Sequence, residues 1–292
     1  MGSAWLQFIA SGLTAGAIYA LVALGFSIIY NASQVINFAQ GEFVMLGALV
    51  MVSLWSHAHL PLWAAFPLTV ILVAAFGMVF ERVAIRTVRR PSPILLVLIT
   101  VGASIFLRGV SMLIWGKDAY SVPSFSQARA IEIHGAFLLP QSLWILGIVV
   151  ALVVGLNLFY HKTLTGKAMQ ACAIDKRAAS LLGVGTRKII LLAWGLAAGL
   201  GAVAGVIIAP ITMSVYDMGT MLGLKGFCAA MLGGLGSFWG AVVGGVVLGV
   251  LEAMGVGYGS SGLRDAIAFF LLLLILYARP TGILGKASIQ RF

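Results

Sequence analysis

Nine apolar segments, separated by short polar stretches, dominate this sequence and decide its fold class. They lie at 6–30, 42–55, 62–81, 94–115, 143–160, 188–208, 212–234, 239–254 and 264–278. A helix of about 20 apolar residues crosses the hydrocarbon core of a bilayer, whereas a β-barrel would show short segments of alternating polarity. The sequence therefore predicts an all-α, polytopic integral membrane protein. We expect residues 1–292 to form a single transmembrane domain of eight or nine helical segments.

The scarcity of charged residues supports this class. Only 9% of the residues are charged and 61% are hydrophobic, whereas a soluble domain carries about 25% charged residues. The formal net charge of +10 could indicate nucleic-acid binding, but the Lys and Arg residues cluster between apolar runs, as the positive-inside rule describes. We therefore expect the chain to be surrounded by membrane lipid and to bind no nucleic acid.

The basic residues also predict how the segments are oriented. They gather within 82–90, 161–188 and 279–291, which we place in the cytoplasm, and are sparser within 116–142, which we place outside. Parity then requires 209–263 to start and finish outside, with the glycine-rich "LGGLGSFWG" (232–240) at the apex of a hairpin that dips inward. Because 42–55 and 239–254 are short for a full span, we expect tilted, re-entrant or broken helices there.

A polar group marks the start of the second apolar segment, in "NFAQGEF" (37–43). Asn37, Gln40 and Glu42 surround Gly41, where a helix is expected to begin. An isolated charge in hydrocarbon costs about 2.5–3.5 kcal/mol on insertion scales, so Glu42 needs a partner, water or a role. Glu42 either caps the helix N-terminus or lines a polar vestibule together with the other three residues, and the two roles are compatible.

Other charges fall near or within the apolar segments. Glu81 lies at an expected helix end, at the membrane interface. Glu252 lies within an apolar segment, with apolar residues on both sides in the sequence. Arg264 and Asp265 mark the start of the last helix, where Asp265 would favour the positive end of the helix dipole. Arg108 falls in the middle of a segment and needs a carboxylate partner that the sequence does not identify.

Pairs of glycines four residues apart recur along the chain. Such pairs let two helices approach closely, either within the chain or at a subunit interface. They are Gly12/Gly16, Gly195/Gly199, Gly201/Gly205, Gly240/Gly244 and Gly245/Gly249. The bends at 37–43 and 232–240 both join a small-residue turn to a Gly- and Ala-rich helix, so an internal repeat is one interpretation of the sequence.

The chain shows no constellation of residues that would indicate an enzyme. "HKTLTGKA" (161–168) and "PTGILGKA" (280–287) resemble a phosphate-binding loop but lack its first Gly and its final Ser or Thr. His57 and His59 lie two residues apart without a third ligand near them in sequence. We therefore expect no catalytic residues, no metal site and no nucleotide site in this chain.

The most polar stretch, "LTGKAMQACAIDKRAASLLGVGTRK" (164–188), is predicted to be cytoplasmic. Its Ala-rich helical pattern ends at Gly183, a plausible helix stop. Leu181 and Leu182 follow Ala178 and Ala179 at helical spacing, which indicates an exposed apolar ridge. A structured loop of this length favours a docking element over a simple solvated connector.

Four blocks, in order along the chain, resemble the branched-chain amino acid ABC transporter permease family, close to its LivH type. They are "INFAQGEFVMLGA" (36–48), "DKRAASLLGVGTRKI" (175–189), "GLKGFCAAMLGGLGSFWGAVVGG" (223–245) and "RPTGILG" (279–285). The resemblance implies a multi-pass permease of the bacterial inner (plasma) membrane. It also implies a second, related permease (LivM type), two ATPase subunits that bind the ATP, and a periplasmic solute-binding protein.

The resemblance further implies a coupling loop at about 161–188 that docks into the ATPase. The residues that correspond to it are Asp175, Arg177, Ala178, Ala179, Leu182 and Gly183. They depart from the general importer pattern of Glu-Ala-Ala followed by Gly, because the acidic residue here is Asp175 and the two alanines are shifted. Asn37, Gln40, Gly41 and Glu42 are then the expected translocation pathway, and the chain itself binds no cofactor.

The sequence leaves the solute and the energy source open to alternatives. Similar permeases serve urea and short amides as well as branched-chain and other amino acids. A secondary transporter would need buried acidic pairs in broken helices, for which only Glu42 and Glu252 qualify. A passive channel for a small solute is the remaining alternative.

Overall fold

The computed structural model describes residues 2–88, 92–126, 130–133, 136–260 and 262–285. Arg89, Arg90, Lys286 and Arg291, on which part of the orientation argument rests, lie outside the described residues. The helices are α1 (Gly2–Ser33), α2 (Gln40–Ser56), α3 (Leu62–Phe80), α4 (Pro93–Trp115), α5 (Pro140–Lys162), α6 (Leu164–Ile174), α7 (Lys176–Leu181), α8 (Thr186–Ile208), α9 (Met218–Gly233), α10 (Phe238–Tyr258) and α11 (Leu263–Ala278). A π-helical turn, η1 (Glu81–Ile85), extends α3, and β1 (Ile131–Ile133) pairs antiparallel with β2 (Ala136–Leu138).

The all-α, polytopic fold class is confirmed. Among the described residues, six helices are long and apolar enough to cross a membrane, namely α1, α3 with its extension, α4, α5, α8 and α10. The helices α2 and α9 are apolar but shorter. Exposed apolar residues on α3 and α4, such as Ile71, Leu98 and Phe106, form the surface expected of helices that face lipid.

One expectation about short helices is wrong. The segment 239–254 belongs to α10 (Phe238–Tyr258), which has 21 residues and is therefore long enough to cross the bilayer. The short helix is instead α9, with 16 residues. The predicted segment 212–234 loses its first part to a turn that follows Pro210, a residue that cannot continue the hydrogen bonding of α8.

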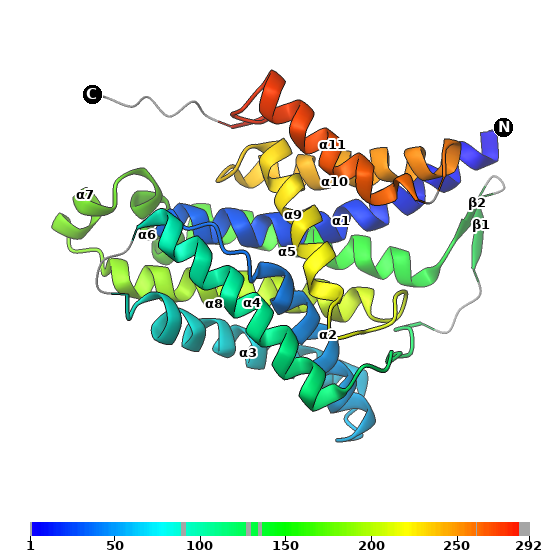
Figure 1. Cartoon of the computed structure of the whole chain (residues 1–292), viewed down its shortest axis with the longest axis horizontal. Coiled ribbons are helices and arrows are strands. Elements are labelled where there is room, and N and C mark those ends of the chain that lie inside the picture. Colours follow the sequence, from blue (N-terminus) through cyan, green and yellow to red (C-terminus); the bar gives the residue numbers. More distant parts are fainter. Residues whose placement is uncertain (1, 89–91, 127–129, 134–135, 261, 286–292) are drawn as a thin grey trace.

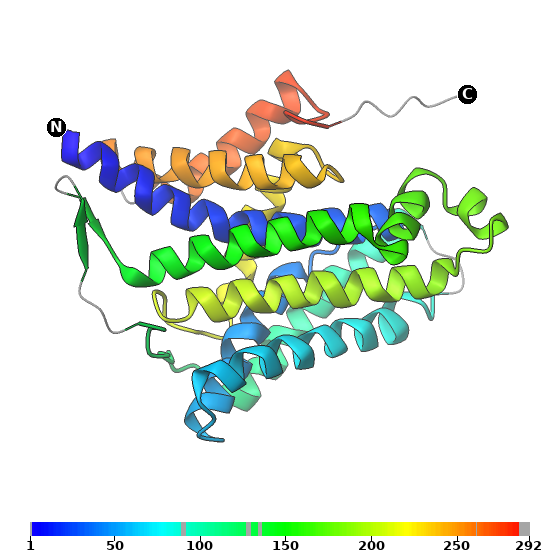
Figure 2. The same cartoon turned by 180° about the vertical axis from the view of Figure 1, so that it is seen from behind.

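The molecule has two distinct ends along its long axis (Figures 1 and 2). The helices α6 and α7 project at one end, which we call the α7 end. The β1–β2 hairpin and the start of α1 lie at the other, which we call the hairpin end. The helices α1, α5, α8 and α10 run along this axis, and α9 crosses between them at a steep angle (Figure 1).

At each end of the molecule, segments that the sequence predicts to lie on the same side of the membrane contact one another. At the hairpin end, Gln7 accepts a hydrogen bond at Oε1 from the Phe137 amide (2.8 Å), and Tyr120 forms an isolated β-bridge with Ser214. At the α7 end, the Ile283 amide donates to the Leu232 carbonyl (2.9 Å), which places the 232–240 bend beside the C-terminal segment. The first helix therefore starts on the predicted outer side.

The glycine pairs pack against helices of the same chain. A Cβ atom at Gly16 would lie 2.9 Å from the Gly245 carbonyl oxygen, and one at Gly201 would lie 2.8 Å from the Phe43 Cβ atom. At these two positions a methyl group would require a neighbouring element to shift, whereas at Gly199 the nearest atoms would lie at an ordinary 3.7 Å. The pairs join α1 to α10, α8 to α3, α8 to α2 and α10 to α9, so their role in this structure is internal helix packing.

Candidate functional site

The bend after α1 delivers the start of α2 into the middle of the bundle. Gln40 donates from Nε2 to the carbonyl oxygen of Ala197, midway along α8 (2.9 Å). Gly41 lies against α9, where a Cβ atom would come within 2.8 Å of the Gly223 Cα atom. The short helix expected here is confirmed, with 17 residues, and its start lies deep in the bundle. The helices α2 and α9 cross at glycines that permit backbone contact.

The two bends that suggested an internal repeat lie at different depths. Gln40, at the first bend, contacts the middle of α8. Gly236, at the second, accepts a hydrogen bond from Asn31 near the end of α1 (2.7 Å). The two bends are therefore not positioned alike in the bundle, and the repeat itself stays a prediction.

Glu42 does not cap α2. Among the described residues, no side chain caps α2 at its N-cap residue, Ala39. The side chain that bonds nearest to this point is Asn37, whose Oδ1 accepts a hydrogen bond from the Ala39 amide (3.0 Å). Glu42 Oε1 instead accepts from the Ser104 hydroxyl of α4 (2.7 Å). The capping interpretation is wrong because the Glu42 side chain points out of the first turn of α2 towards α4.

The partner of Arg108 is Glu42. Arg108 Nε lies 3.5 Å from Glu42 Oε1, so the two charges expected to need partners in the membrane form an ion pair across α2 and α4, in which Arg108 Nε makes no hydrogen bond to any described residue. These helices are joined along their length by hydrogen bonds between residues 62 positions apart. The contacts are Phe38–Thr100 (3.2 Å), Glu42–Ser104 (2.7 Å) and Ser53–Trp115 (2.7 Å). The constant offset shows that α2 and α4 run parallel and in register.

The four predicted pathway residues are all buried in this conformation. Within the described residues, Asn37 Nδ2, Gln40 Oε1 and Glu42 Oε2 have no hydrogen-bond partner. The Thr220 hydroxyl of α9 is likewise buried without one. Buried polar atoms in proteins are nearly always paired with protein or ordered water, so this group calls for water or a polar ligand. It forms a closed polar seam rather than an open vestibule.

A second charged cluster, with Lys225 and Glu252 buried at its centre, joins four helices near the hairpin end. Lys225 of α9 pairs with Glu252 of α10 (2.9 Å) and with Asp265 of α11 (2.7 Å). Arg264 of α11 also pairs with Glu252, and Tyr19 of α1 donates its hydroxyl to Glu252 Oε2 (3.0 Å). Lys225 and Glu252 are only 5% and 2% exposed. Arg264 and Asp265 are therefore partners of buried charges and not only markers of a helix start.

Lys225 is the member of this cluster that sequence reasoning missed. It lies inside the Gly-rich block that carries the family resemblance, so it did not stand out as a charge within a membrane segment. The sequence does contain a signal that could have identified Lys225: a lysine in the middle of a 16-residue apolar helix requires a buried anion as its partner. Glu252 is the acidic residue of the next apolar segment.

The predicted cytoplasmic docking stretch folds as two helices, with Asp175 between them. Asp175 Oδ1 accepts from the amides of Arg177 (2.7 Å) and Ala178 (3.0 Å), which caps the start of α7. These backbone hydrogen bonds lower the pKa of the Asp175 carboxyl below its usual value. The predicted stop is confirmed, because α7 ends at Leu181 and Gly183 has a positive φ of 87°, as in glycine-terminated helices.

The apolar ridge of this stretch is narrower than predicted. Leu181 and Leu182 are 89% and 85% exposed, but Ala179 is only 2% exposed. Ala179 packs into the hydrophobic core, together with Ile189 of α8. It therefore holds α7 in place. The large apolar side chains that this stretch exposes are Leu181 and Leu182, together with Leu164 and Ile174 of α6.

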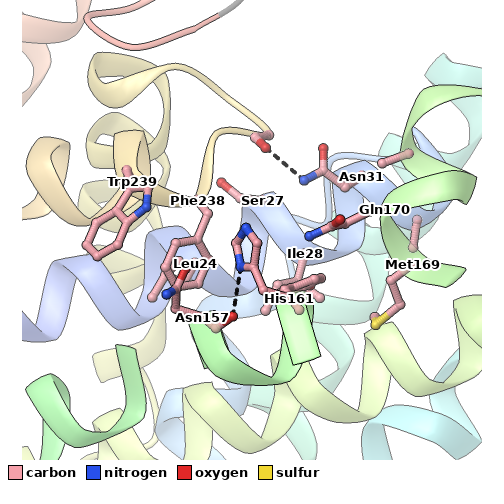
Figure 3. A pocket seen from close by; sticks show the side chains of 14 residues that line it. Leu24, Ser27, Ile28, Asn31, Asn157, His161, Met169, Gln170, Phe238 and Trp239 are labelled. Atoms are coloured by element: carbon pink, nitrogen blue, oxygen red, sulfur yellow. Dashed lines mark hydrogen bonds between the residues drawn. The ribbon is translucent and has the colours of Figure 1, made fainter. Parts of the chain in front are cut away.

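Beneath α6 lies a cavity of about 260 Å³ where the ends of α1, α5 and α10 meet (Figure 3). Asn31 Nδ2 donates to the Gly236 carbonyl (2.7 Å), and a His161 ring nitrogen lies 2.9 Å from the Asn157 carbonyl. Met169 and Gln170 of α6 line one side of the cavity (Figure 3). The base of the projecting helices thus borders the same cavity as the ends of α1, α5 and α10.

Residues 8–276 match the family model described as "branched-chain amino acid transport system / permease component". The chain belongs to this family. It is 35% identical to the permease protein BraD of a high-affinity branched-chain amino acid transport system of Pseudomonas aeruginosa, over 98% of each chain. It is 34% identical to LivH of the corresponding system of Escherichia coli K12, over 98% of this chain and 97% of that protein.

A solved structure, PsaBC from Streptococcus pneumoniae in complex with Fab, aligns with a TM-score of 0.46 and 16% identity. The alignment covers 96% of this chain and 92% of that chain, and this similarity is too low to establish a common fold. The family match confirms the resemblance that the four sequence blocks carried, and identifies the chain as a polytopic membrane permease component.

Proposed function

We propose that this chain is the transmembrane permease subunit of an ATP-driven importer in the inner (plasma) membrane, with branched-chain or other amino acids as solutes. The family match supports this proposal. The structural observation that carries it is the projecting pair α6–α7, whose tip exposes two large apolar side chains, Leu181 and Leu182. Exposed apolar side chains at the predicted cytoplasmic end are explained by a protein partner.

The proposal assigns a partner to each end of the molecule. Two ATPase subunits bind at the α7 end, where they contact Arg177, Ala178, Leu182 and their neighbours. A solute-binding protein approaches the hairpin end, and a second, related permease of the LivM type completes the membrane part. The chain itself is not an enzyme and binds no cofactor, because ATP is bound by the partner subunits.

Coupling follows from the contacts at the base of α6. A partner can shift a conformational equilibrium only by binding its states with different affinity. Because α6 shares a cavity wall with the ends of α1, α5 and α10 (Figure 3), a displacement of α6 and α7 changes how those helices pack. Asp175 and Gly183 fix the two ends of α7, and Ala179 anchors it, so the pair moves as a unit.

The pathway in this proposal is the polar seam between α2, α4 and α9. Asn37, Gln40 and Glu42 supply the unpaired buried polar atoms. Gly41 has no side chain, so the backbones of α2 and α9 can approach closely where the helices cross. Separation of α4 from α2 would break only a few hydrogen bonds and would expose polar atoms on both helices. A polar solute could then replace those hydrogen bonds as it passes.

The experiment that tests this function is solute uptake by proteoliposomes that contain the complete system. With both permeases, the ATPases, ATP and the binding protein, leucine should accumulate against its gradient. Omission of ATP or of the ATPases should abolish accumulation. Uptake that persists without ATP and responds to ionophores would instead indicate a secondary transporter, and flux only down the gradient would indicate a channel.

A further inference from the structure

Two cavities near the hairpin end meet at Arg264. The first, of about 420 Å³, has Lys225 and Arg264 in its wall and is otherwise largely apolar. The second, of about 360 Å³, has Glu252 and Arg264 in its wall. Gln7, Ser11 and Ala15 of α1 line both. We call them the lysine cavity and the glutamate cavity. The buried cation Lys225 lines the first, the buried anion Glu252 lines the second, and the Arg264 guanidinium lines both.

The two cations at this junction, Lys225 and Arg264, have N–H donors that are not used within the cluster. Lys225 uses two of its N–H groups on Glu252 and Asp265, out of three that an ammonium group carries. Arg264 donates its Nε–H to Glu252, out of five N–H groups in a guanidinium, and its side chain is 58% exposed. An incoming carboxylate could therefore bind to Arg264 and Lys225 without displacing Glu252.

The net charge of the cluster selects the kind of ligand. Lys225 and Arg264 carry two positive charges, and Glu252 and Asp265 carry two negative charges, so the cluster is formally neutral. Lys225 and Glu252 are buried, so a simple anion or cation bound against them would leave an uncompensated charge away from water, which is costly. A zwitterion preserves neutrality. Its carboxylate can bind Lys225 and Arg264 from the lysine cavity, while its ammonium group lies at the junction with the glutamate cavity, which Glu252 lines.

The walls of the lysine cavity specify the rest of the ligand. Its apolar residues include Ile211, Met213, Met218 and Met221, three of which are methionines. Unbranched thioether side chains adapt to apolar groups of different shape. The site therefore suits an aliphatic side chain carried by a compact zwitterionic head.

We propose that the Lys225–Glu252–Arg264 junction is a binding site on the hairpin side for an α-amino acid with an aliphatic side chain. The inference rests on the proposed function, which it deepens by locating where the permease itself recognises the solute. The site lies apart from the Glu42–Arg108 seam, so it would receive the amino acid before the seam opens. Urea or a short amide, which carries no paired charges, would gain little from it.

The test uses the full chain in nanodiscs, without ATPases or binding protein. A Met221→Cys substitution places a thiol in the lysine cavity, away from the charged cluster, and its labelling by a maleimide is timed. The wild-type chain measures the background from Cys172 and Cys228, which are buried. At about ten times the half-protecting concentration, leucine should slow the labelling about tenfold, because mass action leaves that fraction of sites free.

Ligand analogues and two control variants decide the outcome. Leucinamide, which lacks the carboxylate, and 4-methylpentanoate, which lacks the ammonium group, should protect far less than leucine. Arg264→Gln, at an exposed side chain, should raise the half-protecting concentration of leucine by about tenfold or more. A thiol in Leu181→Cys, at the opposite end, should be labelled equally with and without leucine.

Three results would overturn the proposal: no protection by leucine, equal protection by leucine and 4-methylpentanoate, or an unchanged half-protecting concentration in the Arg264→Gln chain. If leucine fails to protect while the complete system still accumulates it with ATP, the site is wrong and the proposed function stands. If leucine protects but ATP-driven uptake is absent, the site stands and the proposed function fails.

Discussion

Arg108 of α4 lies 3.5 Å from Glu42 of α2, and the same Glu42 oxygen accepts a hydrogen bond from Ser104. The second Glu42 oxygen is buried and has no partner among the described residues. One carboxylate therefore both holds α4 against α2 and keeps an unused acceptor at the point where α2 crosses α9.

Replacement of Glu42 by Ala should impair transport and folding together. The change removes the acceptor of Ser104 and the counter-charge of Arg108, which costs about 1–3 kcal/mol where a polar group is left unpaired. Glu42→Gln keeps an acceptor for Ser104 and should fold better while still transporting slowly. Thermal stability in detergent and leucine uptake measure the two effects. Wild-type uptake by a normally expressed Glu42→Ala protein would show that the carboxylate is dispensable.

Gly41→Ala should push α2 away from α9 and destabilise the protein. The added methyl group would overlap the backbone at Gly219 and Gly223, and overpacking of this kind costs about 1–3 kcal/mol. The matched control is Gly147→Ala in α5, where nothing lies within 4 Å of the added methyl group. The melting temperature should fall for the first variant and not for the second; equal melting temperatures would contradict the close crossing.

Gly183→Leu should uncouple ATP hydrolysis from uptake while membrane insertion stays intact. Leucine at a position with a φ of 87° carries a backbone strain of about 1–3 kcal/mol, which would disturb the end of α7. The control is Gly185→Leu, because Gly185 has an ordinary φ of −70° and its nearest neighbouring atom would be 3.9 Å away. Equal coupling ratios in the two variants would exclude a special role for the α7 terminus.

Ala179→Leu should uncouple for a different reason. Ala179 is buried, so the larger side chain would lift α7 from its support, whereas Leu182→Asp would change only the exposed surface. Both variants should retain the amount of protein in the membrane and lose ATPase binding. Co-purification with the ATPase subunits measures this loss, and normal co-purification of Leu182→Asp would remove the apolar tip from the docking surface.

Acidification should loosen the start of α7. The pKa of Asp175 is lowered in the folded protein, so the cap contributes stability above the unfolded value of about 4 and loses it as the pH falls through the folded value. Hydrogen exchange of the Arg177 and Ala178 amides, compared at each pH with an Asp175→Asn chain, follows the effect. Asparagine still caps a helix but does not titrate, so a difference between the chains that is independent of pH would contradict this origin.

The helices of this protein are largely predictable because long apolar runs permit few other structures in a bilayer. The expected segment 188–208 appears as α8 (Thr186–Ile208), and 94–115 appears as α4 (Pro93–Trp115). The lengths of α9 and α10 were not predictable from hydropathy alone. The predicted segment 239–254 already contained Glu252, but α10 continues to Tyr258 through residues that hydropathy alone did not assign to it.

The candidate site was predictable in its residue types but not in its contacts. "NFAQGEF" identified a polar group at a helix start, and that group is buried at the centre of the bundle. The sequence could not pair Glu42 with Arg108, because those residues meet only when α2 and α4 align in parallel. It also could not show that Ala179 points inward while Leu182 points outward, since one turn of helix contains both.

The most direct test of the proposed function is ATP-driven leucine accumulation by proteoliposomes with and without the partner subunits. The account predicts accumulation with the complete system, none with this chain alone, and no ATP hydrolysis by this chain alone. Leucine concentrated against its gradient by the isolated chain, or ATP split by it, would contradict the account.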